Sequence, residues 1–141
     1  MKELIVEGNT LIDAPAAKVW EVLIAPKFIR QWDSLPEDFA DYYLEIGREI
    51  EWSGNSKWTV TEMVACEYLN MSLFLSKWGV PPSTVDINCS YTISTQNDQT
   101  HLAIRIGDFE SLADGEEYFL SYKDFVIKVL DKIKALAENR A

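Results

Sequence analysis

Apolar and polar residues alternate at the start of the chain and then recur at helical spacing. Val6 and Ile12 share one face of an extended segment, because side chains two residues apart point the same way in a strand. Pro15 suits the first position of a helix, and Asp13 just upstream can cap it. The pattern predicts a strand over residues 3–12, a helix from about Pro15 to Ala25, and a short helical turn around residues 28–32.

Strand patterns then follow one another from Tyr42 onward, at the spacing of an antiparallel meander. We count five more strands, each with one apolar and one polar face, which predicts a sheet covered on one side and open to water on the other. Cys89 and Tyr91, for example, alternate with Asn88 and Ser90. The turn signals between the strands are Gly47, Gly54-Asn55, Cys66-Glu67, Gly79 to Pro82, and Asn97-Asp98.

The last segment has the pattern of a long amphipathic helix. Asp114 can cap its start, and Glu117 three residues later fits a capping box. Apolar residues recur at spacings of three and four over about 25 residues, so they form one stripe along the helix. We expect this helix to cover the apolar face of the sheet. The stripe consists of Phe119, Tyr122, Val126, Val129, Ile133 and Leu136.

Length and composition fit one soluble domain over residues 1–141. The chain is 48% hydrophobic with a mean hydropathy of −0.11, and a domain of this length can bury a core without disulfides or metals. No apolar run approaches the roughly 20 residues of a membrane span, and the first residues lack the apolar stretch of a signal peptide. We therefore expect a cytoplasmic protein in which Cys66 and Cys89 are reduced thiols.

Charge restricts the partners. The chain has 13 Lys and Arg against 23 Asp and Glu, which gives a net charge of −10. Such a surface repels phosphate groups, so we expect neither nucleic acid nor an anionic membrane as a partner, and no membrane insertion. Nothing in the sequence indicates the oligomeric state.

Residues for catalysis or metal binding are sparse. His101 is the only histidine and falls on the expected solvent face, so a nucleophile–histidine site is not indicated. One histidine and two separated cysteines offer no zinc shell, and the stretch from Gly47 to Gly54 lacks the following helix of a phosphate loop. We expect no metal and no cofactor.

Several segments are similar to one known family. Residues 12–23, followed by Pro26 and Trp32, resemble the opening of proteins like the activator of the heat-shock protein 90 ATPase. Residues 59–64 and Leu69 resemble the middle strands of that family, residues 83–85 its next strand, and residues 100–109 its last. The family often has a Trp in its last helix where this chain offers Tyr118 or Tyr122.

This family belongs to the START-like, or SRPBCC, superfamily, which shares the helix-grip fold of the birch-pollen allergen. The resemblance implies an α+β fold in which a curved antiparallel sheet of about six to seven strands wraps around a long C-terminal helix. Short helices follow the first strand in that fold. The superfamily includes lipid carriers, hormone receptors, polyketide cyclases and co-chaperone domains, so the resemblance does not select one function.

The resemblance also implies a cavity for apolar ligands between the sheet and the last helix. Large aromatic residues at inward positions agree with a cavity, and a packed aromatic core is the alternative. Trp78, in the loop before Pro81-Pro82, is a candidate gate at the cavity mouth, or it covers the sheet edge. The residues expected to line the cavity are Trp52, Trp58, Val60, Glu62, Leu73, Ile87, Cys89, Tyr91, Phe119, Tyr122 and Val126.

Whether the expected cavity contains a carboxylate depends on the orientation of Glu62. A register that buries Trp58, Val60 and Val64 also turns Glu62 inward, where Arg48 is a candidate counter-charge. A slip of one residue instead places Glu62 in solvent beside Lys57.

The leading hypothesis is a non-enzymatic module that binds a lipid-like or polyketide-like small molecule. One alternative is a co-chaperone-type module that meets a basic chaperone surface through an acidic outer sheet face. The other is an enzyme of the cyclase or aromatase type, with Glu62 and Tyr91 as weak candidates for proton transfer.

Overall fold

The computed structural model describes residues 4–32, 39, 42–52, 56–75, 87–112 and 114–138. In this part of the chain, no helix is long and apolar enough to cross a membrane. The elements are β1 (Val6–Ile12), α1 (Ala16–Ile24), α2 (Pro26–Trp32), β2 (Glu49–Trp52), β3 (Ser56–Val64), β4 (Tyr68–Leu75), β5 (Asn88–Gln96), β6 (Gln99–Gly107), a short 3-10 helix (Phe109–Ser111) and α3 (Gly115–Ala137).

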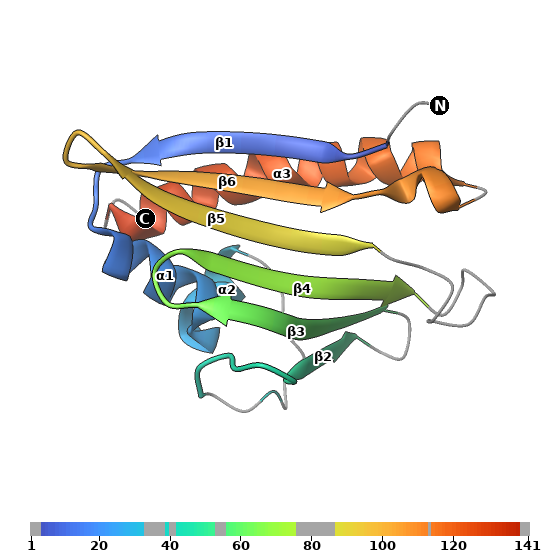
Figure 1. Cartoon of the computed structure of the whole chain (residues 1–141), viewed down its shortest axis with the longest axis horizontal. Coiled ribbons are helices and arrows are strands. Elements are labelled where there is room, and N and C mark those ends of the chain that lie inside the picture. Colours follow the sequence, from blue (N-terminus) through green and yellow to red (C-terminus); the bar gives the residue numbers. More distant parts are fainter. Residues whose placement is uncertain are drawn as a thin grey trace.

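The strands form one curved antiparallel sheet in the order β1-β6-β5-β4-β3-β2 (Figure 1). The first strand therefore lies beside the last, with Val6 opposite Ile106 and Ile12 opposite Thr100. In Figure 1, α3 runs behind β1 and β6, and α1 and α2 lie behind one end of the sheet. This arrangement confirms the predicted sheet, its two short helices and its long C-terminal helix.

Alternation along the strands separates a buried inner face from a polar outer face. On β4, Leu69, Met71 and Leu73 are buried, and Cys89 and Tyr91 lie opposite them on β5. These apolar side chains form one core cluster with those of α1, α2 and α3. The described helices thus cover one face of the sheet, as the sequence pattern predicts.

Close contact of α3 with β1 and with the short 3-10 helix depends on two glycines. A Cβ atom on Gly8 of β1 would lie 2.7 Å from Cγ1 of Val126 and 3.0 Å from Cδ1 of Leu130. A Cβ atom on Gly115, the first residue of α3, would lie 2.0 Å from the carbonyl oxygen of Phe109. Both positions exclude a larger side chain, because the opposing atoms already fill the space.

The helix starts differ in detail from the sequence prediction. Pro15 rather than Asp13 is the N-cap of α1, and Asp114 is the N-cap of α3 without a capping hydrogen bond from its side chain. Asp13 instead takes part in a polar junction between β1 and the end of α3. Packing of the apolar stripe against the sheet therefore contributes more to the position of α3 than its cap does.

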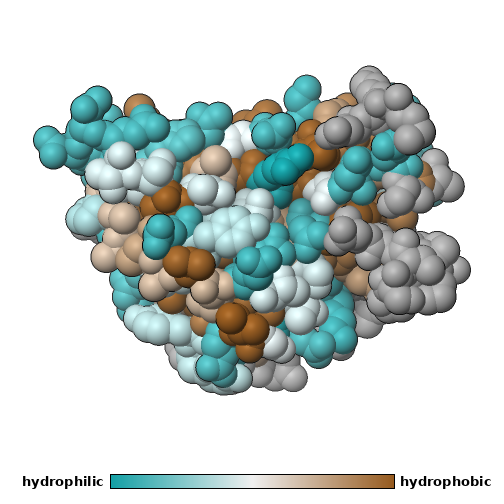
Figure 2. Space-filling view, in the orientation of Figure 1, coloured by the Kyte–Doolittle hydropathy of each residue, from teal (hydrophilic) through white to brown (hydrophobic). Residues whose placement is uncertain are grey.

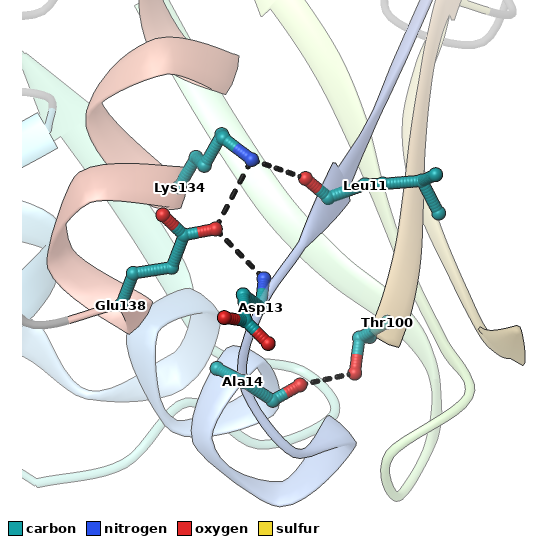
Figure 3. Close-up of polar contacts among 6 residues, drawn as sticks. All are labelled: Leu11, Asp13, Ala14, Thr100, Lys134 and Glu138. Carbon is teal, nitrogen blue, oxygen red and sulfur yellow. Dashed lines mark hydrogen bonds and ion pairs between the residues drawn. The ribbon is translucent and has the colours of Figure 1, made fainter. Parts of the chain in front are cut away.

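That junction is centred on Glu138 (Figure 3). Its carboxylate accepts a hydrogen bond of 2.7 Å from the backbone N–H of Asp13 and pairs with Lys134 at 3.0 Å. Lys134 also donates to the backbone oxygen of Leu11 at 2.5 Å. Beside this junction, the Thr100 hydroxyl donates to the backbone oxygen of Ala14 at 2.5 Å. The end of α3 is thus fixed to both β1 and the start of α1.

Candidate functional site

Most residues predicted to line an interior site lie in the core. Their exposed fractions are 8% or less, so they pack against other side chains and form the inner wall between the sheet and the helices. These residues are Trp58, Val60, Leu73, Ile87, Cys89, Tyr91 and Val126.

Tyr122 of α3 is the centre of an aromatic cluster on this inner side. Its ring stacks on Phe109 with centroids 5.4 Å apart and an interplanar angle of 11°. Trp58 of β3 meets it edge to face at 6.5 Å, and Phe125 does so at 5.8 Å. Such stacked and edge-to-face pairs are favourable contacts between aromatic rings. The cluster connects α3 to β3.

The first half of α3 presents its aromatic residues at the boundary between core and solvent. Tyr118, Phe119, Tyr122 and Phe125 are only partly buried although they pack against the core, whereas Val126 is buried. An aromatic surface that is partly covered can contact an apolar molecule at little cost in rearrangement. This part of α3 is where the described aromatic cluster is least covered.

Tyr91 lies deeper, and its surroundings are fixed by a tryptophan of α2. The rings of Tyr91 and Trp32 meet edge to face with centroids 6.3 Å apart. The Trp32 indole N–H donates to the backbone oxygen of Val22 at 2.8 Å, which holds the indole in place. Tyr91 is 2% exposed and therefore belongs to the rigid inner wall.

The structure decides between the two orientations considered for Glu62, and it places the side chain in solvent. Val60 pairs with Met71, but Glu62 pairs with Asn70, so Thr61 is an extra residue in β3 and forms a bulge. After the bulge the faces exchange: Met63 packs against the core, while Glu62 is exposed and Val64 is 48% exposed. Glu62 and Val64 therefore lie on the outer face. Glu62 cannot act on the same substrate as Tyr91, which faces the interior.

Arg48 and Lys57 were the expected charged neighbours of Glu62, and among the described contacts neither of them pairs with it. The buried guanidinium of Arg48 lies over the rings of Phe39 and Tyr42, 3.9 and 3.6 Å from their centroids. It also donates to the backbone oxygen of Tyr42. Lys57 pairs with Glu49 of β2 at 2.8 Å.

Two predicted aromatic residues add little to this site. Trp52 ends β2, opposite Ser56 of β3, and its side chain lies outside the described part of the structure. Trp78, the candidate gate, lies outside the described residues altogether.

The outer face of the sheet carries a polar groove that the sequence analysis did not single out (Figure 2). The groove has a volume of about 670 Å³. Four outward hydroxyl and amide side chains from β4 and β5 lie at its centre, between Glu62 of β3 and Arg105 of β6. The sequence could have indicated this groove, because its polar residues alternate with the core positions of β4 and β5. The four are Asn70, Ser72, Asn88 and Ser90.

Asn70 holds the floor of this groove in a fixed arrangement. Its amide nitrogen donates to Oγ1 of Thr61 at 2.7 Å and to Oδ1 of Asn88 at 3.0 Å. The hydroxyl of Tyr68 donates to its amide oxygen at 3.4 Å. Although it points outward, Asn70 is only 8% exposed, because neighbouring side chains rise around it. The floor of the groove is thus neutral and polar.

Another hollow, of about 440 Å³, lies beside the start of α2. It is lined by Ala25, Pro26, Lys27, Tyr42 and Tyr43. Tyr42 and Tyr43 are more than half exposed, and Ile46 nearby in the chain is 64% exposed. This region is the described surface with aromatic side chains most open to solvent.

Groups for metal binding or nucleophilic catalysis do not come together in the described residues. His101 is partly buried on the outer-face side of β6, opposite Leu11 of β1. No cluster of three metal-ligating side chains occurs in this part of the chain. Cys89 is buried and Cys66 lies in the turn after β3, and they do not form a disulfide.

A curved sheet that holds a long C-terminal helix, with two short helices after the first strand, defines the helix-grip class of START-like proteins. The chain belongs, within that class, to the family described as Activator of Hsp90 ATPase homolog 1-like protein, whose model matches residues 13–138. No curated protein sequence matches the chain.

Solved structures support the same fold. The protein MLL2253 from Mesorhizobium loti is 18% identical with a TM-score of 0.77, and the match covers 97% of this chain and 98% of that one. The Aha1 dimer from Colwellia psychrerythraea is 15% identical with a TM-score of 0.75, covering 96% and 97%. CalU16 from Micromonospora echinospora is 18% identical with a TM-score of 0.71, covering 97% of this chain and 76% of its own. At these identities the likeness concerns the fold.

Proposed function

We propose that this protein binds a hydrophobic or aromatic small molecule between α3 and the inner face of the sheet. The observation that carries the proposal is the partial exposure of Tyr118, Phe119, Tyr122 and Phe125 along the first half of α3. These side chains continue an aromatic core that includes Trp58 and Phe109. A ligand that covers them removes apolar surface from water, which is the main favourable term in such binding.

The contacts favour a ligand with a flat or extended apolar body. Tyr122 offers its ring between Phe109 and Trp58, and aromatic edges and faces accept planar rings as readily as aliphatic chains. No charged side chain is among the residues that form this cluster in the described structure. We therefore propose lipid-like or polyketide-like molecules rather than charged metabolites, and binding without a cofactor.

The test is a thermal-shift screen of the purified protein with fatty acids, isoprenoids, sterols, flavonoids and aromatic polyketide mimics. A ligand at a concentration of about 100 times its Kd stabilises the folded state by about 2.7 kcal/mol. This raises the midpoint temperature of thermal unfolding by several degrees. For the class that produces a shift, Tyr122→Ala should weaken binding about tenfold or more, since it removes the central ring. Tyr122→Phe keeps the ring and should bind nearly as the parent does.

The matched control is Leu120→Ala on the same helix, because Leu120 is 61% exposed and lies off the inward stripe. It should leave the Kd unchanged. Equal binding by the Tyr122→Ala variant and the parent would refute the site. No shift with any class would refute the small-molecule proposal.

A protein-interaction role is the second candidate. The observation that favours it is the exposed group of Tyr42, Tyr43 and Ile46 beside the hollow at α2, since exposed aromatic residues are common at protein interfaces. The family description supplies the partner to test, which is Hsp90. An assay of the Hsp90 ATPase rate with and without the protein separates this role from the first.

We further propose that residues 1–141 act as one domain in the cytoplasm. Cys66 and Cys89 do not form a disulfide, which is consistent with a reducing compartment.

A further inference from the structure

Glu62, Asn70, Ser90 and Arg105 form one row across the outer face of the sheet. Glu62 pairs with Asn70, Asn70 with Ser90, and Ser90 with Arg105, so the row crosses β3, β4, β5 and β6. All four line the polar groove. The row has a carboxylate at one end, a guanidinium at the other and hydrogen-bonding groups between them.

The guanidinium of Arg105 is available to a ligand. Arg105 is exposed, and its side chain makes no hydrogen bond or ion pair with any other residue in the described ranges. Glu7 lies opposite it on β1, outside the residues that line the groove. A planar guanidinium with its donors free binds a carboxylate with two parallel hydrogen bonds.

The other charges limit what the groove accepts. Asp108 also lines the groove, and its Oδ1 already accepts the backbone N–H groups of Leu4 and Glu110 at 2.9 Å each. Glu62 is exposed at the far end of the row. Two carboxylates and one guanidinium disfavour a ligand with a large negative charge, as does the net charge of −10. A cationic group near Glu62 is favoured instead.

Spacing limits the size of the ligand. Three strand spacings of about 4.8 Å separate the backbone of Glu62 from that of Arg105, which is roughly 14 Å. The two long side chains span much of this distance when they lean inward, so the gap between the charged groups suits one small molecule. The floor is preorganised, because Asn70 is held by Thr61 and Asn88.

We propose that the outer groove is a second binding site, for small zwitterions of the amino-acid class. The ligand carboxylate pairs with Arg105 and its ammonium pairs with Glu62. Ser72, Ser90 and Asn88 offer hydrogen bonds to the body of the ligand. The site is separate from the interior proposed for apolar ligands, because Glu62 and Arg105 lie on the opposite face of the sheet.

The test is an NMR titration of the uniformly ¹⁵N-labelled protein with glycine, β-alanine and serine. Acetate and glycinamide, which carry only one of the two charges, are titrated in parallel. We expect saturable shifts for at least one zwitterion, confined to amides of β3 to β6 around the groove. Acetate and glycinamide should bind at least about tenfold more weakly, because each loses one charged contact.

Two variants test the assignment of the charges. Arg105→Gln and Glu62→Gln should each weaken zwitterion binding about tenfold, and both should fold normally because the replaced side chains are exposed. Lys132→Gln removes an exposed charge from α3 and serves as the matched control, with unchanged binding.

Each of the following results would overturn the proposal: no saturable shift with any zwitterion, acetate binding as tightly as β-alanine, or unchanged binding in Arg105→Gln. Shifts centred on α3 instead of the outer strands would do so as well. Failure of the apolar-ligand screen leaves this experiment unaffected, since the two sites are probed with different molecules and different variants.

Discussion

Tyr43 illustrates how one hydrogen bond changes the chemistry of an exposed side chain. Its hydroxyl donates to Oε2 of Glu21 at 3.1 Å. This hydrogen bond, and then the negative charge of Glu21, raises the pKa of Tyr43 above its usual value, because ionised tyrosine would lose the bond and face a like charge. The contact joins α1 to the segment before β2. Because the pKa is raised, the hydrogen bond between Tyr43 and Glu21 stabilises the fold at a pH below the ordinary tyrosine pKa. This contribution is lost as the pH rises through the pKa of folded Tyr43.

Replacing the acceptor should restore ordinary titration. In Glu21→Gln we expect the pKa of Tyr43 to fall toward its usual range, as followed by an NMR pH titration of protein with ¹³C-labelled tyrosine. Glu117→Gln removes an exposed carboxylate from α3 and should leave the Tyr43 curve in place. If Glu21→Gln leaves the curve unchanged as well, the contact with Glu21 does not cause the raised pKa.

Among the elements, α3 depends most clearly on close packing at its start. Gly115 is the first helical residue, and a Cβ atom there would collide with the carbonyl oxygen of Phe109. In most helices Gly→Ala is stabilising, by about 0.5–1 kcal/mol, since alanine loses less backbone freedom on folding. At this position the collision makes the substitution destabilising, because the backbone atoms of Phe109 cannot move aside as a flexible side chain can.

We therefore expect Gly115→Ala to lower the free energy of unfolding by about 1–3 kcal/mol, the usual range for overpacking. Urea denaturation of the variant and the parent measures the difference. Ser121→Ala, at an exposed position on the same helix, should be neutral or slightly stabilising. A Gly115→Ala variant more stable than the parent would show that the helix start shifts freely.

Periodicity predicted the strands and helices well, and it failed where one residue breaks the period. The alternation of Cys89 and Tyr91 gave the correct faces of β5, because no insertion interrupts that strand. In β3 the bulge at Thr61 reverses the faces, so the register that buried Val64 was wrong after this point. A bulge depends on pairing with the neighbouring strand, which the sequence of one strand does not contain. The sequence left two orientations open for Glu62, and only the structure selects the outer one and shows the polar groove.

Across the whole molecule, the end of α3 is joined to the end of β1 through polar contacts. Glu138 accepts from the backbone N–H of Asp13, which is distant in the sequence, and pairs with Lys134 one helical turn before it. The side chain of Glu138 is only 9% exposed, so its charge-assisted hydrogen bonds are partly shielded from water. The sequence predicted the helix and the strand but not this contact, because no local pattern relates residue 138 to residue 13.

Removing the carboxylate should destabilise the fold. Glu138→Ala leaves the backbone N–H of Asp13 and the ammonium of Lys134 without this acceptor, and we expect a loss of about 1.5–3 kcal/mol in unfolding free energy. Thermal and urea unfolding measure it. Asp131→Ala, at an exposed position of the same helix, is the control and should change stability by less than about 0.5 kcal/mol. A loss no larger than that of the control would mean that the junction contributes nothing measurable.

The pairing of β1 with β6 has a consequence for the order of folding. Val6 meets its partner Ile106 only after most of the chain has left the ribosome, and α3, which packs against β1 at Gly8, is synthesised later still. Until then β1 has no neighbouring strand, and the apolar face of the meander has no long helix to cover it. Contacts so distant in sequence make folding slow for a chain of this size. The nascent protein thus exposes the apolar face of the sheet to aggregation until α3 has been synthesised and covers it.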